Sequence, residues 1–192
     1  MSAWYELLIK GPDGALRSLL GTQQGTEGRK VIDASKLPLQ GESFTERILD
    51  FLGARTHHLL FAPAETAQAL VRGLEKNPDL RLERLREVED AGFTFEVETP
   101  SRSKAQEIHR ALHTDIPPGI SLLDVRESGE VDPEARGVEL YAPAHDFAYR
   151  ASGSFQGDLP GVLEMHRRLD EMDFCKPGSI VVEAREVEGL PG

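Results

Sequence analysis

The chain has 192 residues, of which 39% are hydrophobic and 29% are charged, and its formal net charge at pH 7 is -11. This length and composition predict a folded protein of one large or two small domains and exclude a disordered chain. The negative charge disfavours binding to nucleic acid or to an anionic membrane, because both are polyanions and no basic cluster offsets the charge of the whole chain. The single cysteine, Cys175, excludes an intramolecular disulfide.

The first residues predict no export signal. Residues 1–6 have neither the basic start nor the apolar core of a signal peptide. No apolar run approaches the roughly 20 residues that span a bilayer. We therefore expect a cytoplasmic protein that does not cross or bind a membrane.

Residues 6–10 form an apolar run that predicts a strand. The segment that follows has two interpretations. Its proline, aspartate and glycine at 12–14 favour a hairpin turn. Its likeness to residues 58–68, where a proline and an acid also follow an apolar strand, instead favours a helix over 12–20. Both interpretations stay open.

Residues 21–56 match no other part of the chain and predict an insertion or linker. One helix is expected there, because Ser43 and Glu46 form a capping box ahead of an apolar stripe. Long non-repeating segments often carry function, and Arg29 and Lys30 are candidates for holding an anionic ligand. The glycines before them lack the rest of a phosphate-loop signature, so a flexible connector is the alternative.

Residues 57–127 predict six elements in the order β-α-β-β-α-β. An apolar strand leads into a helix that ends before Pro78, since proline cannot continue a helix interior. Two alternating strands then form a hairpin around a turn at 89–92, and Ser101 caps a helix that leads to a closing strand. This order is the ferredoxin-like arrangement, with helices on one face of an antiparallel sheet.

The second half of the chain contains an internal repeat. Residues 108–112 and 165–169 share a helix pattern with His and Arg in matching places. Residues 122–127 and 181–186 share the strand pattern apolar, apolar, acid, apolar, Arg, Glu. The repeat predicts that a helix, its stop and a strand were duplicated.

The repeat extends to a prediction for the whole chain. Residues 137–188 supply β-β-α-β but lack an opening β-α, which residues 1–20 could provide. We therefore expect an α+β protein of tandem ferredoxin-like units: a continuous inner unit over 57–127 and a discontinuous outer unit made of 1–20 plus 137–188.

His145 and Asp146 are the candidate catalytic residues. An imidazole beside a carboxylate could act as a general base, because histidine exchanges its proton near neutral pH. They fall in the expected turn of the outer hairpin, where adjacent side chains point apart and an aspartate is explained by bonds to nearby backbone. Sequence alone does not decide between these interpretations.

His109 and His113 are weak candidates for metal ligands. They are four residues apart on a predicted helix and could hold an ion if a carboxylate from elsewhere joined them. The alternative is a favourable interaction of the rings with the negative end of the helix.

Lys176 beside Cys175 would favour the thiolate, but no base accompanies the cysteine, which is interpreted as incidental. No metal or other cofactor is expected.

The chain contains no local catalytic signature, neither a serine elbow nor a dinucleotide fingerprint. With the duplicated scaffold, this favours a non-catalytic protein that binds a small ligand or a protein partner, or that regulates another protein. A small hydrolase or isomerase using His145 and Asp146 is the alternative. A homodimer is compatible with open sheet edges.

Overall fold

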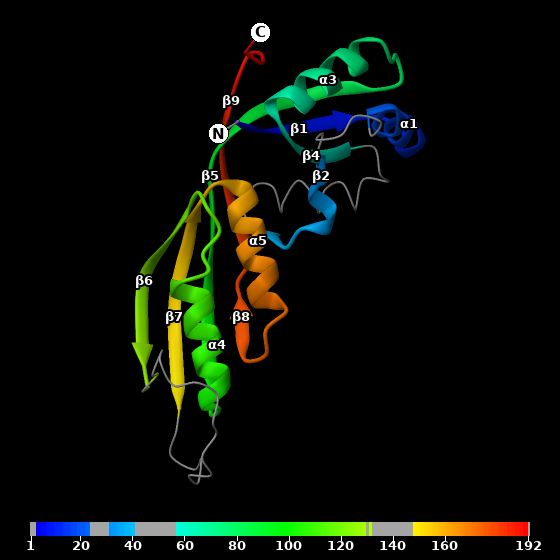
Figure 1. The fold of residues 1–192 in the computed structure, drawn as a ribbon. Coiled ribbons are helices and arrows are strands. Elements are labelled where there is room, and N and C mark those ends of the chain that lie inside the picture. The colour runs from blue at the N-terminus through cyan, green and yellow to red at the C-terminus, as the bar shows by residue number, and fades with distance from the viewer. Residues whose placement is uncertain (1–2, 24–30, 41–56, 130, 132–147, 192) are drawn as a thin grey trace. The chain divides into compact units, whose positions relative to one another are not determined.

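The computed structural model describes residues 3–23, 31–40, 57–129, 131 and 148–191 (Figure 1). These residues form a mixed α+β structure with four α-helices and nine β-strands. They divide into two compact units: Met1–Glu89 with Ile180–Gly192, and Asp90–Ser179. No helix among the described residues is long and apolar enough to cross a membrane.

The first unit is built on an antiparallel ladder with the strand order β2-β4-β1-β5. Its elements, in chain order, are β1 (Trp4–Lys10), α1 (Asp13–Gln23), β2 (Ile32–Asp33), the 3-10 turn η1 (Ala34–Lys36), β3 (Leu39–Gln40), β4 (His57–Pro63), α3 (Ala64–Glu75), the first half of β5 (Arg81–Thr99) and β9 (Ile180–Glu186). β9 pairs with β5 and, in parallel, with β3.

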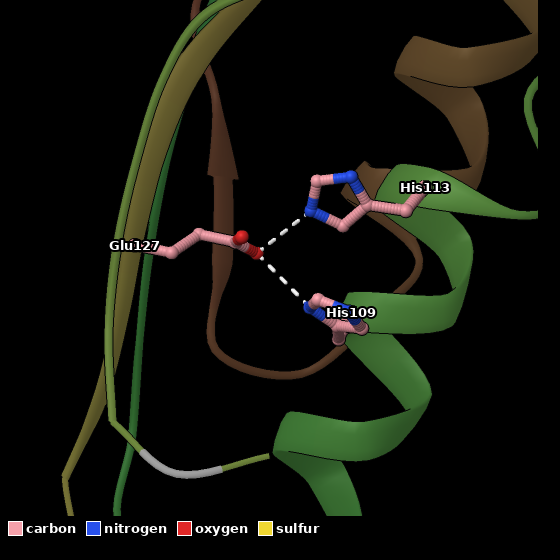
Figure 2. Close-up of side chains that lie close together, drawn as sticks. All are labelled: His109, His113 and Glu127. Carbon is pink, nitrogen blue, oxygen red and sulfur yellow. Dashed lines mark hydrogen bonds and ion pairs between the residues drawn. The ribbon is translucent and has the colours of Figure 1, made fainter. Parts of the chain in front are cut away.

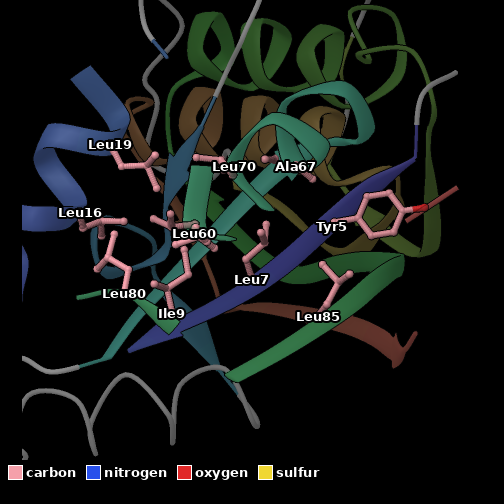
Figure 3. Close-up of a cluster of buried hydrophobic side chains, with 12 residues drawn as sticks. Tyr5, Leu7, Ile9, Leu16, Leu19, Leu60, Ala67, Leu70, Leu80 and Leu85 are labelled. Carbon is pink, nitrogen blue, oxygen red and sulfur yellow. The ribbon is translucent and has the colours of Figure 1, made fainter. Parts of the chain in front are cut away.

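Helix α1 decides the alternative that the sequence left open, since the chain after β1 is helical and makes no hairpin. Leu16 and Leu19 of this helix are buried against Leu7 and Ile9 of β1 (Figure 3). The same cluster takes in α3 through Leu70. Burial of these apolar side chains is therefore what holds both helices to the strands.

A buried ion pair joins β1 to β5 in the first unit. Glu6 is 1% exposed and lies directly opposite Arg86, which is 6% exposed. Arg86 Nε donates to Glu6 Oε1 at 2.7 Å, and Arg84 Nη2 donates to the same oxygen at 3.0 Å. Because a buried carboxylate is tolerated only when paired, the arginines are needed to keep Glu6 in place.

The second unit has the strand order β8-β5-β7-β6, and β5 pairs antiparallel with both β8 and β7, as does β7 with β6. Its elements are the second half of β5, α4 (Arg102–His113), β6 (Ile120–Ser128), β7 (Tyr149–Gly157), α5 (Leu159–Asp170) and β8 (Cys175–Pro177). Figure 1 shows α4 and α5 on the same side of these strands. Ile108 of α4 and Met165 of α5 are fully buried, as is Phe155 of β7.

The prediction of a hairpin around residues 89–92 is wrong. β5 runs through this segment as one strand of 19 residues. Gly92 lies in the ladder opposite Gln156, and a Cβ on it would come within 2.8 Å of the Phe155 carbonyl oxygen. The glycine therefore permits a close approach of two backbones, where the sequence pattern had suggested a turn.

The unbroken β5 changes how the chain divides. The boundaries between the compact units fall at residues 89/90 and 179/180 of the chain, whereas the sequence suggested an inner unit over 57–127 and an outer one over 1–20 plus 137–188. Residues 57–89 lie with the N-terminal strand, because β4 and β5 flank β1 on its two sides. The repeated strands also separate, since β6 belongs to the second unit and β9 to the first.

Replacing Glu6 by Ala is expected to lower the free energy of unfolding of the first unit by about 3–5 kcal/mol, because it removes the buried carboxylate that Arg84 and Arg86 share. Urea unfolding followed by the fluorescence of Trp4, the chain's one tryptophan and a β1 residue, measures this. The control is Arg185→Ala, which removes the ion pairs of an exposed arginine with Glu87 and Glu89 and is expected to change the stability much less, because water screens exposed pairs. Equal losses in the two variants would contradict a stabilising role for the buried pair.

Candidate functional site

Three side chains of the second unit converge on one carboxylate oxygen, Oε1 of Glu127. Helix α4 places His109 and His113 one turn apart on the same face. Figure 2 shows Glu127 reaching from β6 towards both rings; Oε1 is 3.1 Å from His109 Nδ1 and 2.9 Å from His113 Nε2. The hydroxyl of Tyr149 on β7 donates to the same oxygen at 2.6 Å.

A β-bulge turns Glu127 towards the helices. Leu123 pairs with Ser154 and Arg126 with Ser152, so the two residues between them on β6 face Gly153 alone. One extra residue reverses which side of the sheet all later side chains face. Glu127 consequently pairs with Ala151, which is buried on the helix side.

The bulge depends on backbone conformations that few residues adopt easily. Asp124 has a φ of 53°, the left-handed region that aspartate tolerates better than most residues. Gly153 faces the bulge, and a Cβ on it would lie 3.0 Å from the Leu123 carbonyl oxygen and 3.2 Å from the Phe95 ring. The aim of Glu127 thus depends on local backbone geometry as well as on its own position in the sequence.

The surroundings of Glu127 favour its ionised form. Burial alone would raise its pKa, but hydrogen bonds from Tyr149 and His113, the charge of His113 and a bond from His109 outweigh this, and the pKa is lowered. Burial and the neighbouring Glu127 raise the pKa of Tyr149, so its hydroxyl keeps the proton that it donates. The site is an anionic oxygen held by three polar side chains.

These side chains remain reachable from solvent. The exposed fractions are 31% for His109, 35% for His113 and 25% for Glu127. Their ligand atoms lie within 4.8 Å of one another, so these three residues could hold a metal ion. The carboxylate that the sequence required from elsewhere is therefore present beside the histidine pair.

A second feature is a groove of about 700 Å³. Its wall includes Glu96 and Glu98, whose exposed side chains alternate along β5 with the buried Phe95 and Val97. Because alternate residues of a strand face opposite sides, the groove lies over the sheet face turned away from α4 and α5. The lining residues are Glu96, Val97, Glu98, Arg126, Glu127, Ser128, Arg150, Ala151, Ser152, Phe174 and Lys176.

Charges of both signs alternate across the groove. Lys176 lies opposite Glu96 on neighbouring strands, and Arg150 donates to Glu98 at 3.2 Å. Arg126 lies opposite Ser152 on the far strand pair. Among the described residues, neither Arg126 nor Lys176 takes part in an ion pair, so both are available to a ligand.

The other predicted site residues have different outcomes. His145 and Asp146, and likewise Arg29 and Lys30, lie outside the described residues. Cys175 is half-buried, and burial together with the charge of Glu107 raises the pKa of its thiol to about 11. The expectation that Lys176 would favour the thiolate is therefore wrong, because burial outweighs a neighbour whose side chain points to the other side of the strand.

His166, the repeat counterpart of His109, has a structural role. It is buried, its Nε2 is 2.9 Å from the Gly178 carbonyl oxygen, and its ring packs edge-on against Phe93.

No family model matches the chain, and no similar curated protein was found. Function must therefore be inferred from the geometry of the groove and of the cluster around Glu127.

Replacing Asp124 by Ala is expected to lower the free energy of unfolding by about 1 kcal/mol, because alanine is less favourable than aspartate in the left-handed region. Asp124→Gly is the matched control and is expected to cost nothing or to stabilise, since glycine adopts this conformation freely. Denaturant unfolding followed by circular dichroism compares the two. A glycine variant as unstable as the alanine variant would show that the left-handed backbone is not what limits this position.

Ionised Glu127 is expected to stabilise the folded state near neutral pH and to lose this effect in acid. A lowered carboxyl pKa stabilises above its ordinary value of 4.5, and the stabilisation disappears as pH falls through the folded value. The difference in unfolding free energy between the wild type and Glu127→Gln, measured in chelator, is therefore expected to shrink below about pH 4.5. In a background that carries Tyr149→Phe, the effect of Glu127→Gln on the unfolding free energy at neutral pH is expected to be smaller, because the hydrogen bond from Tyr149 to the carboxylate is missing. A difference constant from neutral pH into acid would contradict this.

Proposed function

We propose that this chain is a non-catalytic binding protein with two ferredoxin-like units, and that the second unit binds a small zwitterionic molecule, of the free amino-acid class, in its groove. The observation that carries the proposal is the alternation of cationic and anionic side chains over one exposed sheet face. A zwitterion matches such a surface because it brings one group of each sign.

Strand order supports the ferredoxin-like part of the proposal. Apart from η1 and the strands β3 and β9, the first unit reads β1-α1-β2-β4-α3-β5 along the chain, and these four strands lie in the order β5-β1-β4-β2. The second reads β5-α4-β6-β7-α5-β8, and its strands lie in the order β8-β5-β7-β6. Both have β-α-β-β-α-β order with the same arrangement of strands. In this division β5 ends one unit and begins the next.

The spacing of charges in the groove supports a ligand of amino-acid size. Arg126, Ser152 and Glu96 occupy matching positions on three successive strands. Adjacent strands are about 4.8 Å apart, so the Cα atoms of Arg126 and Glu96 are ~10 Å apart. Their side chains can therefore contact the carboxylate and the ammonium group of one small molecule. Phe174, 46% exposed at the groove, offers its ring to an apolar side chain of the ligand.

The groove's chemistry supports binding without catalysis. Among the residues described as lining it there is neither histidine nor cysteine, and the oxygen Oε1 of Glu127 already accepts bonds from Tyr149, His109 and His113. General acid–base catalysis would have to use the other glutamates of the lining, and both already face a cation: Glu98 accepts a bond from Arg150, and Glu96 lies opposite Lys176. The arginines and the lysine of the lining can bind the anionic groups of a ligand.

At least one standard amino acid with an apolar side chain is expected to raise the melting temperature of the wild type at millimolar concentration, when all twenty are tested. Arg126→Gln is expected to weaken its affinity about tenfold, measured by calorimetry, because a charge-assisted bond to the carboxylate is lost. Arg110→Gln, an exposed position on α4 away from the groove, is the matched control and is expected to bind like the wild type. The proposal fails if no amino acid stabilises the wild type, or if Arg126→Gln binds with unchanged affinity.

A further inference from the structure

We propose that His109, His113 and Glu127 form a binding site for one divalent transition-metal ion of the zinc type, on the helix side of the second unit. Glu127 also borders the amino-acid groove, but the metal-binding proposal does not depend on amino-acid binding. Two imidazole nitrogens and one carboxylate oxygen are a donor set that zinc and its neighbours in the first transition row prefer.

The distances already match those of a metal chelate. Zinc bonds to nitrogen and oxygen are about 2.0–2.2 Å long, so two ligands of a tetrahedral ion lie about 3.3 Å apart. The carboxylate oxygen of Glu127 lies 3.1 Å from Nδ1 of His109 and 2.9 Å from Nε2 of His113. Around an ion, each nitrogen would therefore move only a few tenths of an ångström farther from the carboxylate oxygen, and the two nitrogens already lie within 4.8 Å of each other.

The ligands are held by rigid elements. His109 and His113 are on consecutive turns of α4, which is anchored by the fully buried Ile108 and Leu112. Their ring centroids are 4.4 Å apart. A pre-formed pair of ligands binds more tightly than a flexible one, because less conformational freedom is lost on binding.

The third ligand is positioned by two features of the sheet. The bulge after Leu123 brings Glu127 to the helix side, and the buried Tyr149 hydroxyl holds Oε1. A hydrogen bond to a ligating carboxylate fixes its orientation and commonly changes metal affinity 10–100-fold. Tyr149 is thus a positioning residue for the site.

Metal binding would exchange protons for an ion in this cluster. Each imidazole would coordinate through the nitrogen that now faces Glu127, with its proton on the other ring nitrogen. The carboxylate offsets one of the ion's two charges. Three protein ligands leave a fourth position for a water molecule or a ligand group, as in zinc sites that are open to solvent.

A histidine pair four residues apart is a weaker, two-ligand site by itself, so the role of Glu127 separates the proposal from an incidental pair. Glu127→Gln keeps the size of the side chain and a hydrogen-bond acceptor but removes the charged ligand. Glu107→Gln is the matched control, because it also removes one negative charge, at an exposed position of α4, the helix that carries the two histidines. A general electrostatic effect would weaken binding equally in both variants.

The experiment uses the full chain, stripped with chelator and then dialysed. Zinc is titrated against a coloured competing chelator, and cobalt(II) is added separately to record its visible absorption. We expect one zinc per chain. Binding is expected to be at least about tenfold weaker in Glu127→Gln and about tenfold weaker in Tyr149→Phe, with Glu107→Gln unchanged.

The cobalt spectrum tests the geometry independently of affinity. An intense visible band of low-coordinate cobalt is expected in the wild type and in Glu107→Gln, and its loss in Glu127→Gln and His113→Asn. Circular dichroism checks that each variant is folded. Absence of zinc binding in the wild type, or equal affinities in the wild type and Glu127→Gln, would overturn the proposal. Equal weakening in Glu107→Gln and Glu127→Gln would overturn it as well.

Discussion

The backbone hydrogen-bond ladder of β5 is the constraint on which the rest of the structure depends. This strand pairs with β1 along its first half and with β7 and β8 along its second half. A break in the ladder at residues 89–92 would leave β7 without its partner at Ala91 and Gly92. Unpaired buried backbone groups are costly, which is why the chain keeps extending through a segment whose composition suggests a turn.

Alternation along this ladder gives the second unit two chemically different faces. Phe95 and Val97 face the helices, whereas Glu96 and Glu98 border the groove. The bulge in β6 divides neighbouring residues in the same way, with Arg126 at the groove and Glu127 directed at the histidines of α4. Glu127 thereby becomes a partly exposed carboxylate whose hydrogen bonds outweigh the cost of its partial desolvation.

Much of the local structure could be predicted, since it follows from short-range patterns. Ser101 caps α4 as expected, accepting a bond from the backbone of Lys104. The apolar stripes of α3 and α4 are buried as their spacing indicates. The prediction of a turn at residues 89–92 is wrong because a glycine in a ladder and a glycine in a turn look alike in sequence. Only the opposing strand distinguishes them. The repeated histidines were similarly ambiguous, since His166 bonds a carbonyl oxygen while His109 meets a carboxylate.

The sequence by itself determined the periodicities, the caps and the pairing of His109 with His113 on one helix face, because these depend on residues within about one helical turn of each other. Only the tertiary structure decided that Glu127 and Tyr149 meet that pair, and that charges from four strands border one groove. The physical reason is register. One extra residue in β6 exchanges the two faces of the strand, and such a bulge is set by the fit of Asp124 and Gly153 to the neighbouring backbone, which no pattern along the chain encodes.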